Sequence, residues 1–138
     1  MTPLGEPAWA ALVNQAFVID EPVIDGLSPL LVLAPHPDDE TLGCGGLIAR
    51  AAQRGYRPRV AFLTDGDRSH VGSPTWPIDR LAETRRAEAK AALAILGVPE
   101  EDIVFLGWPD GDPCPPGGID YEATMARLQT WTAPFRPW

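Results

Sequence analysis

The sequence predicts an α/β fold with a Rossmann-like, doubly wound parallel sheet. Along the 138 residues, short apolar segments alternate with longer segments of helical character. This alternation is typical of strand–helix–strand units with right-handed crossovers. Each apolar segment also runs directly into acidic residues. Side chains in that position lie at the carboxyl ends of parallel strands, where open α/β sheets bind their ligands.

Three apolar segments are predicted to be strands. Residues 30–34 (LLVLA) suit a strand covered on both faces, and the prolines that follow cannot donate to a sheet. Residues 59–64 (RVAFLT) and 103–106 (IVFL) form the second and third strands. Three strands make a thin sheet, and the chain stops at Trp138 where another strand is expected. We therefore expect a sheet truncated after the third or fourth strand.

Two helices are predicted between these strands. Residues 41–54 form the first and end at Gly55. Residues 81–96, rich in Ala, Glu and Arg, form the second and end at Gly97. Glycine often follows the last residue of a helix because it adopts the left-handed conformation at little cost.

Together with the remaining segments, these elements are predicted to form a single, incomplete domain over residues 1–138. A third helix is expected from Tyr121 to about Trp131, with Asp120 as its N-cap. Residues 1–28 are expected to pack along one edge of the domain, with a short helix starting in Pro7–Val13.

Composition and charge exclude several classes of protein. Hydrophobic residues make up 45% of the chain, too many for a disordered protein, and no apolar run approaches a membrane span. Met1–Ala10 lacks the pattern of a signal peptide. The net charge of −8 argues against nucleic acid as a partner. Cys44 and Cys114 form no metal or disulfide pattern, so we expect a cytoplasmic protein with reduced thiols.

Acidic residues gather where the three predicted strands end. The first strand leads to residues 36–40 (HPDDE), the second to 65–67 (DGD) and the third to 110–112 (DGD). Like charges in one cleft repel each other unless a cation or protons compensate them. The clustering therefore indicates a metal site at this edge of the sheet.

His36 and Asp39 are candidate metal ligands within this cluster. They are three positions apart and can point at a common ion. Imidazole and carboxylate are good zinc ligands, and a catalytic zinc typically has three protein ligands and a water. Asp38 would then be free to accept a proton from that water. The alternative is that Asp38 or Asp39 only caps the helix that begins near Thr41.

Gly43, Gly45 and Gly46 suggest a different site, a dinucleotide-binding turn. Their spacing is not GxGxxG, and three acids precede them where a pyrophosphate would have to lie. Repulsion counts against that reading. We expect the glycines to let the helix pack closely against the sheet.

Residues 34–46 (APHPDDETLGCGG) resemble the signature of the LmbE-like, or PIG-L, family of zinc-dependent de-N-acetylases. The resemblance continues through residues 63–66, 85–88 with 96–97, and 105–111, and covers about residues 30–112. It implies a metal-dependent hydrolase that removes an N-acetyl or other small acyl group from an amino sugar such as N-acetylglucosamine.

Carried over residue by residue, the resemblance implies a role for six side chains. The zinc (Zn²⁺) ligands would be His36 and Asp39, and the general base Asp38. The substrate-binding residues would be Arg85 and Asp110. Glu40 would orient a ligand or the neighbouring backbone.

The resemblance is incomplete at the metal. The family's third zinc ligand is a histidine from a downstream His-x-x-His motif, whereas this chain has only His36 and His70. His70 lies in a loop, where we interpret it as an exposed histidine or as part of a lid. We expect these 138 residues to bind zinc weakly and to show little catalysis. A His-x-x-His motif after a further strand, in the gene sequence beyond Trp138, would settle the metal site.

Two alternatives from other classes stay open. A magnesium-dependent phosphoryl-transfer enzyme would use the carboxylates and would not need His36. A non-catalytic α/β module would bind a sugar or a partner chain without turnover. An incomplete sheet would also leave a strand edge able to pair with a second copy, giving a homo-oligomer.

Overall fold

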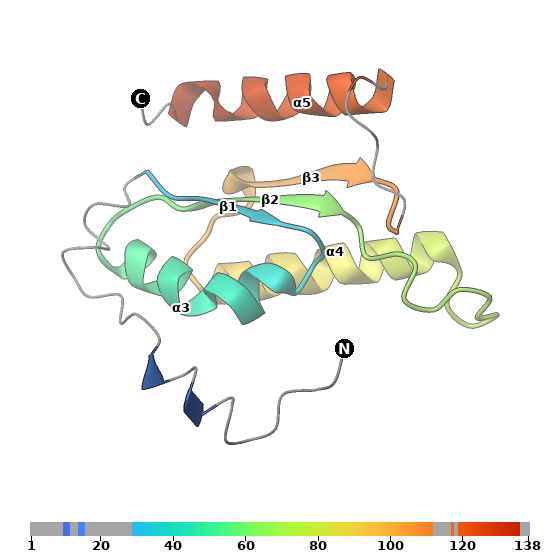
Figure 1. Ribbon diagram of the computed structural model, residues 1–138, viewed down its shortest axis with the longest axis horizontal. Helices are drawn as coiled ribbons and strands as arrows, with labels where there is room; N and C mark the ends of the chain where they lie inside the picture. The colour runs from blue at the N-terminus through green and yellow to red at the C-terminus, as the bar shows by residue number, and fades with distance from the viewer. Residues whose placement is uncertain (1–9, 12–13, 16–28, 112–116, 118, 136–138) are drawn as a thin grey trace.

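The computed structural model describes residues 10–11, 14–15, 29–111, 117 and 119–135. Three parallel strands lie in the order β1-β2-β3. They are β1 (Leu31–Ala34), β2 (Arg59–Thr64) and β3 (Ile103–Trp108). Helices α3 (Asp39–Gln53) and α4 (Ile78–Ile95) lie on one face of the sheet, and α5 (Ile119–Thr132) lies on the other (Figure 1). Helices on both faces of a parallel sheet confirm the predicted fold class.

The strand bounds lie within two residues of the prediction, but β1 is not covered on both faces, because Leu33 is 51% exposed. The second strand has the predicted bounds, while β1 begins one residue later than predicted. Strand β3 continues two residues past Leu106, to Trp108. Its pairing with β2 is irregular there, and Gly107 lies in the irregularity with a φ of 74°. Glycine at such a bulge lets the strand continue where its sequence pattern breaks.

The core lies around β2. Val60 and Phe62 are fully buried, and Phe62 stacks on Phe105 of β3 with ring centroids 4.6 Å apart. These residues form one cluster with Ile48 of α3 and Leu93 of α4. Burial of this cluster holds both helices against the sheet. It therefore also positions the turns that join the helices to the carboxyl ends of β1 and β2.

The helices begin earlier than predicted. The first starts at Asp39 rather than Thr41, and the second at Ile78 rather than Leu81. Helix α5 starts at Ile119, so the prediction that Asp120 is the N-cap is wrong. Asp120 instead lies in the first turn, where an acid is favourable next to the positive end of the helix dipole.

Gly97 ends α4 as predicted. Its φ is 88°, its N–H donates to Ala94 O at 3.2 Å, and the next N–H, of Val98, donates to Leu93 O at 2.9 Å. This is the Schellman arrangement. A Cβ at Gly97 would also lie 2.9 Å from the Cβ of Ala52 in α3. Glycine here therefore both ends α4 and allows the two helices to approach each other.

Some predictions fall outside the described residues. The edge segment 1–28 lies almost wholly outside them, as do Asp112 and Cys114. Two short 3-10 helices, η1 (Glu100–Asp102) and η2 (Ala133–Phe135), were not predicted. Within the parts of the chain that the structure describes, no helix is long and apolar enough to cross a membrane.

Candidate active site

The His36–Glu40 segment runs from the turn after β1 into the first turn of α3, at the carboxyl end of β1. Asp38 has a φ of 137°, and no other non-glycine residue in the described ranges has a positive φ. Such a conformation costs about 1–3 kcal/mol and persists only where its surroundings hold it. The side chain of Asp38 makes no capping hydrogen bond to α3. Capping therefore does not explain this acid.

Glu40 holds the backbone of this turn from the α3 side. Only 1% of its surface is exposed. One carboxylate oxygen accepts the backbone N–H of Asp38 at 2.9 Å, and the other accepts the hydroxyl of Thr41 at 2.7 Å. A buried carboxylate is costly unless it is hydrogen-bonded, and here both oxygens have a partner.

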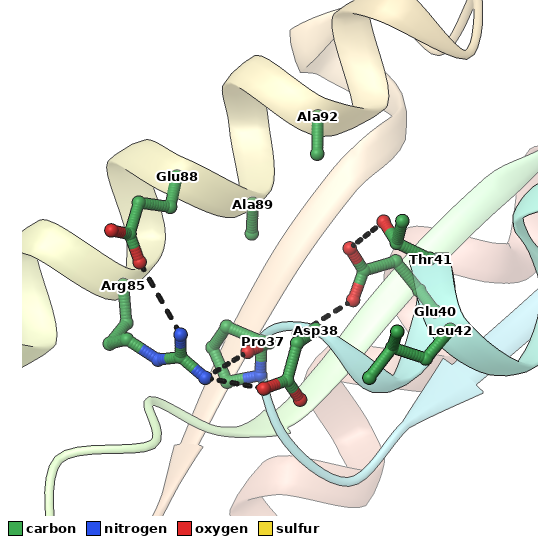
Figure 2. Close-up of a pocket in the computed structure, with 9 residues that line it drawn as sticks. All are labelled: Pro37, Asp38, Glu40, Thr41, Leu42, Arg85, Glu88, Ala89 and Ala92. Carbon is green, nitrogen blue, oxygen red and sulfur yellow. Dashed lines mark hydrogen bonds and ion pairs between the residues drawn. The ribbon is translucent and has the colours of Figure 1, made fainter.

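Arg85 of α4 holds the same turn from the other side (Figure 2). Its Nη2 donates to the carbonyl oxygen of Pro37 at 2.7 Å and to Oδ2 of Asp38 at 2.6 Å, while Nη1 donates to Glu88 at 3.4 Å. Partial burial lowers the pKa of Arg85, but the hydrogen bonds and charges of Asp38 and Glu88 outweigh it, so the pKa is raised. The guanidinium is therefore a permanent positive charge beside Asp38.

His36 lies between two carboxylates. Its Nδ1 is 3.2 Å from Oδ2 of Asp39, and its Nε2 is 3.0 Å from Oδ1 of Asp110. The other oxygen of Asp110 accepts the backbone N–H of Arg68 at 3.2 Å. The fold therefore brings together predicted site residues from two strand ends, 74 positions apart in the chain. A neutral imidazole has a single N–H, so it can donate to only one of these carboxylates at a time.

The pair formed by His36 and Asp39 fits zinc in kind and in spacing. Two ligand atoms of a tetrahedral site with bonds of about 2.0 Å lie about 3.3 Å apart. Nδ1 of His36 and Oδ2 of Asp39 are 3.2 Å apart, and the two side chains are 46% and 43% exposed. Among the described residues, however, no group of three or more His, Cys, Asp or Glu side chains is arranged to hold a metal. The pair is therefore part of a zinc site at most.

Two arginines of α4 compensate part of the negative charge of the acidic cluster. Arg86 donates from Nε to Oδ1 of Asp65 at 2.8 Å and from Nη2 to Oδ2 of the same carboxylate. Arg85 pairs with Asp38. The crowding of acids predicts a compensating metal, but these guanidinium groups supply part of the positive charge. Asp67 keeps a buried Oδ1 without a hydrogen-bond partner in the described part of the chain.

A pocket of about 200 Å³ opens between α3 and α4, next to the turn (Figure 2). Asp38 and Arg85 stand at one end of it, and the small side chains of Ala89 and Ala92 leave the space on the α4 side. Its other lining residues are Pro37, Glu40, Thr41, Leu42 and Glu88.

Several features of the site were not predicted. The carbonyl of Pro37 and the backbone N–H of Arg68 act as hydrogen-bonding groups, and sequence patterns carry no signal for backbone contacts of this kind. His70 is exposed, and the described contacts of its side chain are with Ser69 and with the ring of Trp76 rather than with the His36 group.

The predicted packing role of the α3 glycines is wrong for two of them. A Cβ at Gly43 or Gly46 would meet no atom within 4 Å. Gly45 is buried, but a Cβ there would make only ordinary contacts of 3.7 Å. These positions face open space or loose neighbours because α3 packs on the sheet through its other side chains, such as Ile48 and Ala51.

Comparison with known proteins gives a family match and several similar proteins. The model of the PIG-L family, described as GlcNAc-PI de-N-acetylase, matches residues 31–135. This family is generally zinc-dependent. The 1D-myo-inositol 2-acetamido-2-deoxy-alpha-D-glucopyranoside deacetylase of Mycobacterium sp. (strain KMS) is 40% identical over 114 residues, which cover 76% of this chain and 36% of that protein.

Two further proteins are similar to this chain in sequence or in fold. The mycothiol S-conjugate amidase of Streptomyces coelicolor is 34% identical over 94 residues, covering 63% of this chain and 32% of that protein. The fold is shared with the N,N'-diacetylchitobiose deacetylase of Pyrococcus horikoshii, solved with its inhibitor MPG, at a TM-score of 0.62 and 23% identity. That match covers 93% of this chain and 46% of the other.

The chain thus spans about a third of the length of the curated relatives it matches. The family match agrees with the three-stranded parallel sheet and with the segment that carries His36, Asp38 and Asp39. The chain belongs to the PIG-L family, the family of GlcNAc-PI de-N-acetylase.

Proposed function

We propose that this chain carries the catalytic turn of a zinc-dependent hydrolase that removes an N-acetyl or other small acyl group from an amino sugar. The observation that carries the proposal is the convergence of His36, Asp38 and Asp39 at the end of β1, beside Asp110, in a member of a de-N-acetylase family. Because the chain spans about a third of its relatives, the proposal concerns the activity of the whole protein.

His36 and Asp39 are the proposed zinc ligands. A third ligand would come from outside the described residues, since no third donor stands beside this pair in an arrangement that could hold a metal. When bound, zinc supplies a Lewis acid for the amide carbonyl and lowers the pKa of an attacking water. Family zinc dependence and the 3.2 Å spacing of the two donor atoms support this assignment.

Asp38 is the proposed general base. Its Oδ2 is held by Arg85, whereas Oδ1 makes no hydrogen bond to any of the described residues, and the side chain is 48% exposed. Oδ1 is therefore available to accept a proton from the attacking water. The same oxygen can return that proton to the nitrogen of the leaving amine. One side chain can therefore act first as general base and then as general acid in the hydrolysis of the amide.

Asp110 and Arg85 are proposed to position the sugar. Both lie at the rim of the site, and their charged groups can bind sugar hydroxyls. The substrate class, a small N-acyl amino sugar related to N-acetylglucosamine, is supported by the activities for which the similar proteins are named. The acidic composition supports a cytoplasmic protein without a nucleic acid partner. In the described sheet β1 is an edge strand, which supports the proposal that two copies can pair.

The activity test uses the natural protein at the length its gene encodes. Release of free amine from an N-acetylglucosamine glycoside should require zinc and should stop with a chelator. Asp38→Asn should lower kcat by at least about 100-fold, because general acid–base catalysis typically contributes that much or more. Asp79→Asn is the control, since Asp79 is an exposed acid in the first turn of α4.

Two outcomes would count against the proposal. Full activity in Asp38→Asn would remove the assigned base. A metal-dependent phosphatase activity that survives His36→Ala would favour the phosphoryl-transfer alternative, which needs only oxygen ligands.

A further inference from the structure

We propose that Arg85 and Glu40 are positioning residues that hold Asp38 by clamping one peptide group from both ends. This inference rests on the proposed function, in which Asp38 is the base. In this proposal Arg85 positions Asp38, in addition to making the contact with substrate proposed above.

The clamped group is the peptide bond between Pro37 and Asp38. Its carbonyl oxygen, on Pro37, accepts Nη2 of Arg85 at 2.7 Å. Its N–H, on Asp38, donates to Glu40 at 2.9 Å. Oxygen and N–H point in opposite directions from a planar peptide, so one contact on each fixes the orientation of the plane. The backbone of Asp38 on its amino side, where φ is defined, is thereby set by two charged side chains (Figure 2).

A clamp is needed because the backbone of Asp38 is strained. Its φ of 137° is a region that residues with a side chain rarely adopt. A turn left to itself would relax to a negative φ and carry the carboxylate away with it. The same Nη2 that holds the carbonyl also holds Oδ2 of Asp38 at 2.6 Å, so backbone and carboxylate are fixed by one nitrogen.

The surroundings of both clamp residues fit this role. Glu40 is almost fully buried, and its second oxygen is held by Thr41 at 2.7 Å, so the carboxylate cannot swing away. Nε of Arg85 is buried without a hydrogen-bond partner among the described residues. The contacts of Nη1 and Nη2 with Glu88 and with the turn orient the guanidinium, while Nε is left without a partner among the described residues.

Gly66, after β2, makes room for the clamp. A Cβ at this position would lie 3.1 Å from Cδ of Pro37 and 3.6 Å from Nε of Arg85. The loop that follows β2 therefore packs against both partners of the contact. With Oδ2 fixed in this way, Oδ1 remains in one place for proton transfer, and proton transfer tolerates little displacement of the base.

The test compares Arg85→Met with Arg86→Met in the full 138-residue chain labelled with ¹⁵N. The two arginines are neighbours on α4, but the described contacts of Arg86 are with Asp65 and Phe105 and not with the turn. A backbone near φ 137° has a smaller HN–Hα coupling than either helical or extended backbone. Arg85→Met should therefore increase this coupling at Asp38 and speed exchange of its amide hydrogen about ten-fold, because a local contact is lost. Arg86→Met should change neither.

Unchanged coupling and exchange at Asp38 in Arg85→Met would overturn the clamp. If that variant does not fold, Arg85→Lys replaces it, since lysine keeps the charge but lacks the planar fork. The clamp predicts an intermediate coupling for Arg85→Lys, and the coupling of the parent chain would overturn it. These readouts need no turnover, so they test the clamp even if the proposed deacetylase activity is absent.

Kinetics of the natural protein separate positioning from substrate contact. A positioning role predicts that Arg85→Ala lowers kcat about 100-fold, because small misplacements of a reacting group have effects of that size. It also predicts partial rescue by free guanidinium ion. A rise in KM alone, with kcat and the Asp38 coupling unchanged, would show that Arg85 only binds substrate and would overturn the proposal.

Discussion

Two residues with left-handed backbone meet at the candidate base. Asp38 has a φ of 137° and Gly66 a φ of 64°, and Gly66 lies against Pro37, the residue before Asp38. One is held by charged contacts, while the other needs the absence of a side chain. These short contacts, more than the strands that precede them, therefore determine where the side chain of Asp38 lies.

Gly66→Ala should destabilise the protein by about 1–2 kcal/mol, the usual cost of a left-handed backbone in a residue with a Cβ. The new Cβ would also press on Pro37 at 3.1 Å. The control is Gly43→Ala inside α3, where a Cβ meets nothing within 4 Å. It should stabilise by about 0.5–1 kcal/mol through helix propensity. Urea denaturation at constant m-value measures both, and equal effects of the two substitutions would contradict the argument.

The sequence could predict which residues gather at the site but not how they contact each other. His36, Asp39 and Asp110 follow strand ends, so their meeting is expected for any parallel sheet. The contact between Arg85 and the Pro37 carbonyl joins positions 48 apart and depends on how α4 packs. No residue pattern encodes it, and without the family resemblance Arg85 would be one charge among several on a solvated helix face.

At the scale of elements, a buried acid ties the opposite end of the sheet together. Asp102 of η1 is fully buried and pairs with two arginines. Arg57 lies just before β2, and Arg59 is its first residue. Arg59 also donates to the carbonyl of Trp131 at 2.9 Å, at the end of α5. This network joins β2, η1 and α5. It was not predicted, because the run of acids before β3 has the composition of an exposed turn.

Asp102→Asn should destabilise the chain by about 3 kcal/mol, because breaking a buried ion pair leaves an uncompensated charge. Glu101→Gln is the matched control: Glu101 is adjacent and also pairs with Arg57, but its side chain is 68% exposed. Surface pairs contribute little, so the control should unfold like the parent. Equal stability of Asp102→Asn and the parent chain in thermal unfolding would contradict the role given to this network.

Helix ends were predictable and helix starts were not. Gly55 and Gly97 end α3 and α4 because glycine readily adopts the positive φ that follows a helix. The starts of α3 and α4 lack a side-chain cap in the structure, so no capping residue marked them. The start of α3 matters for function, since it places Asp39 inside the helix and Asp38 just before it.

At the scale of the whole molecule, the parallel pairing of β1, β2 and β3 puts the carboxyl ends of all three strands on one edge of the sheet. Helices α3 and α4 then bring Glu40 and the arginines beneath that edge. The alternation of apolar and helical segments was sufficient to predict this architecture. It could not supply the third zinc ligand, since the described residues arrange no third donor beside His36 and Asp39.

Zinc titration of the 138-residue chain tests the central claim, that His36 and Asp39 form part of a zinc site. Titration calorimetry at neutral pH should show weak binding, because a stable catalytic site needs about three protein ligands. Binding should disappear in His36→Ala and remain in His70→Ala, the other histidine of the chain. Tight stoichiometric binding would show that the site is not incomplete. Binding unchanged by His36→Ala would show that it is not this site.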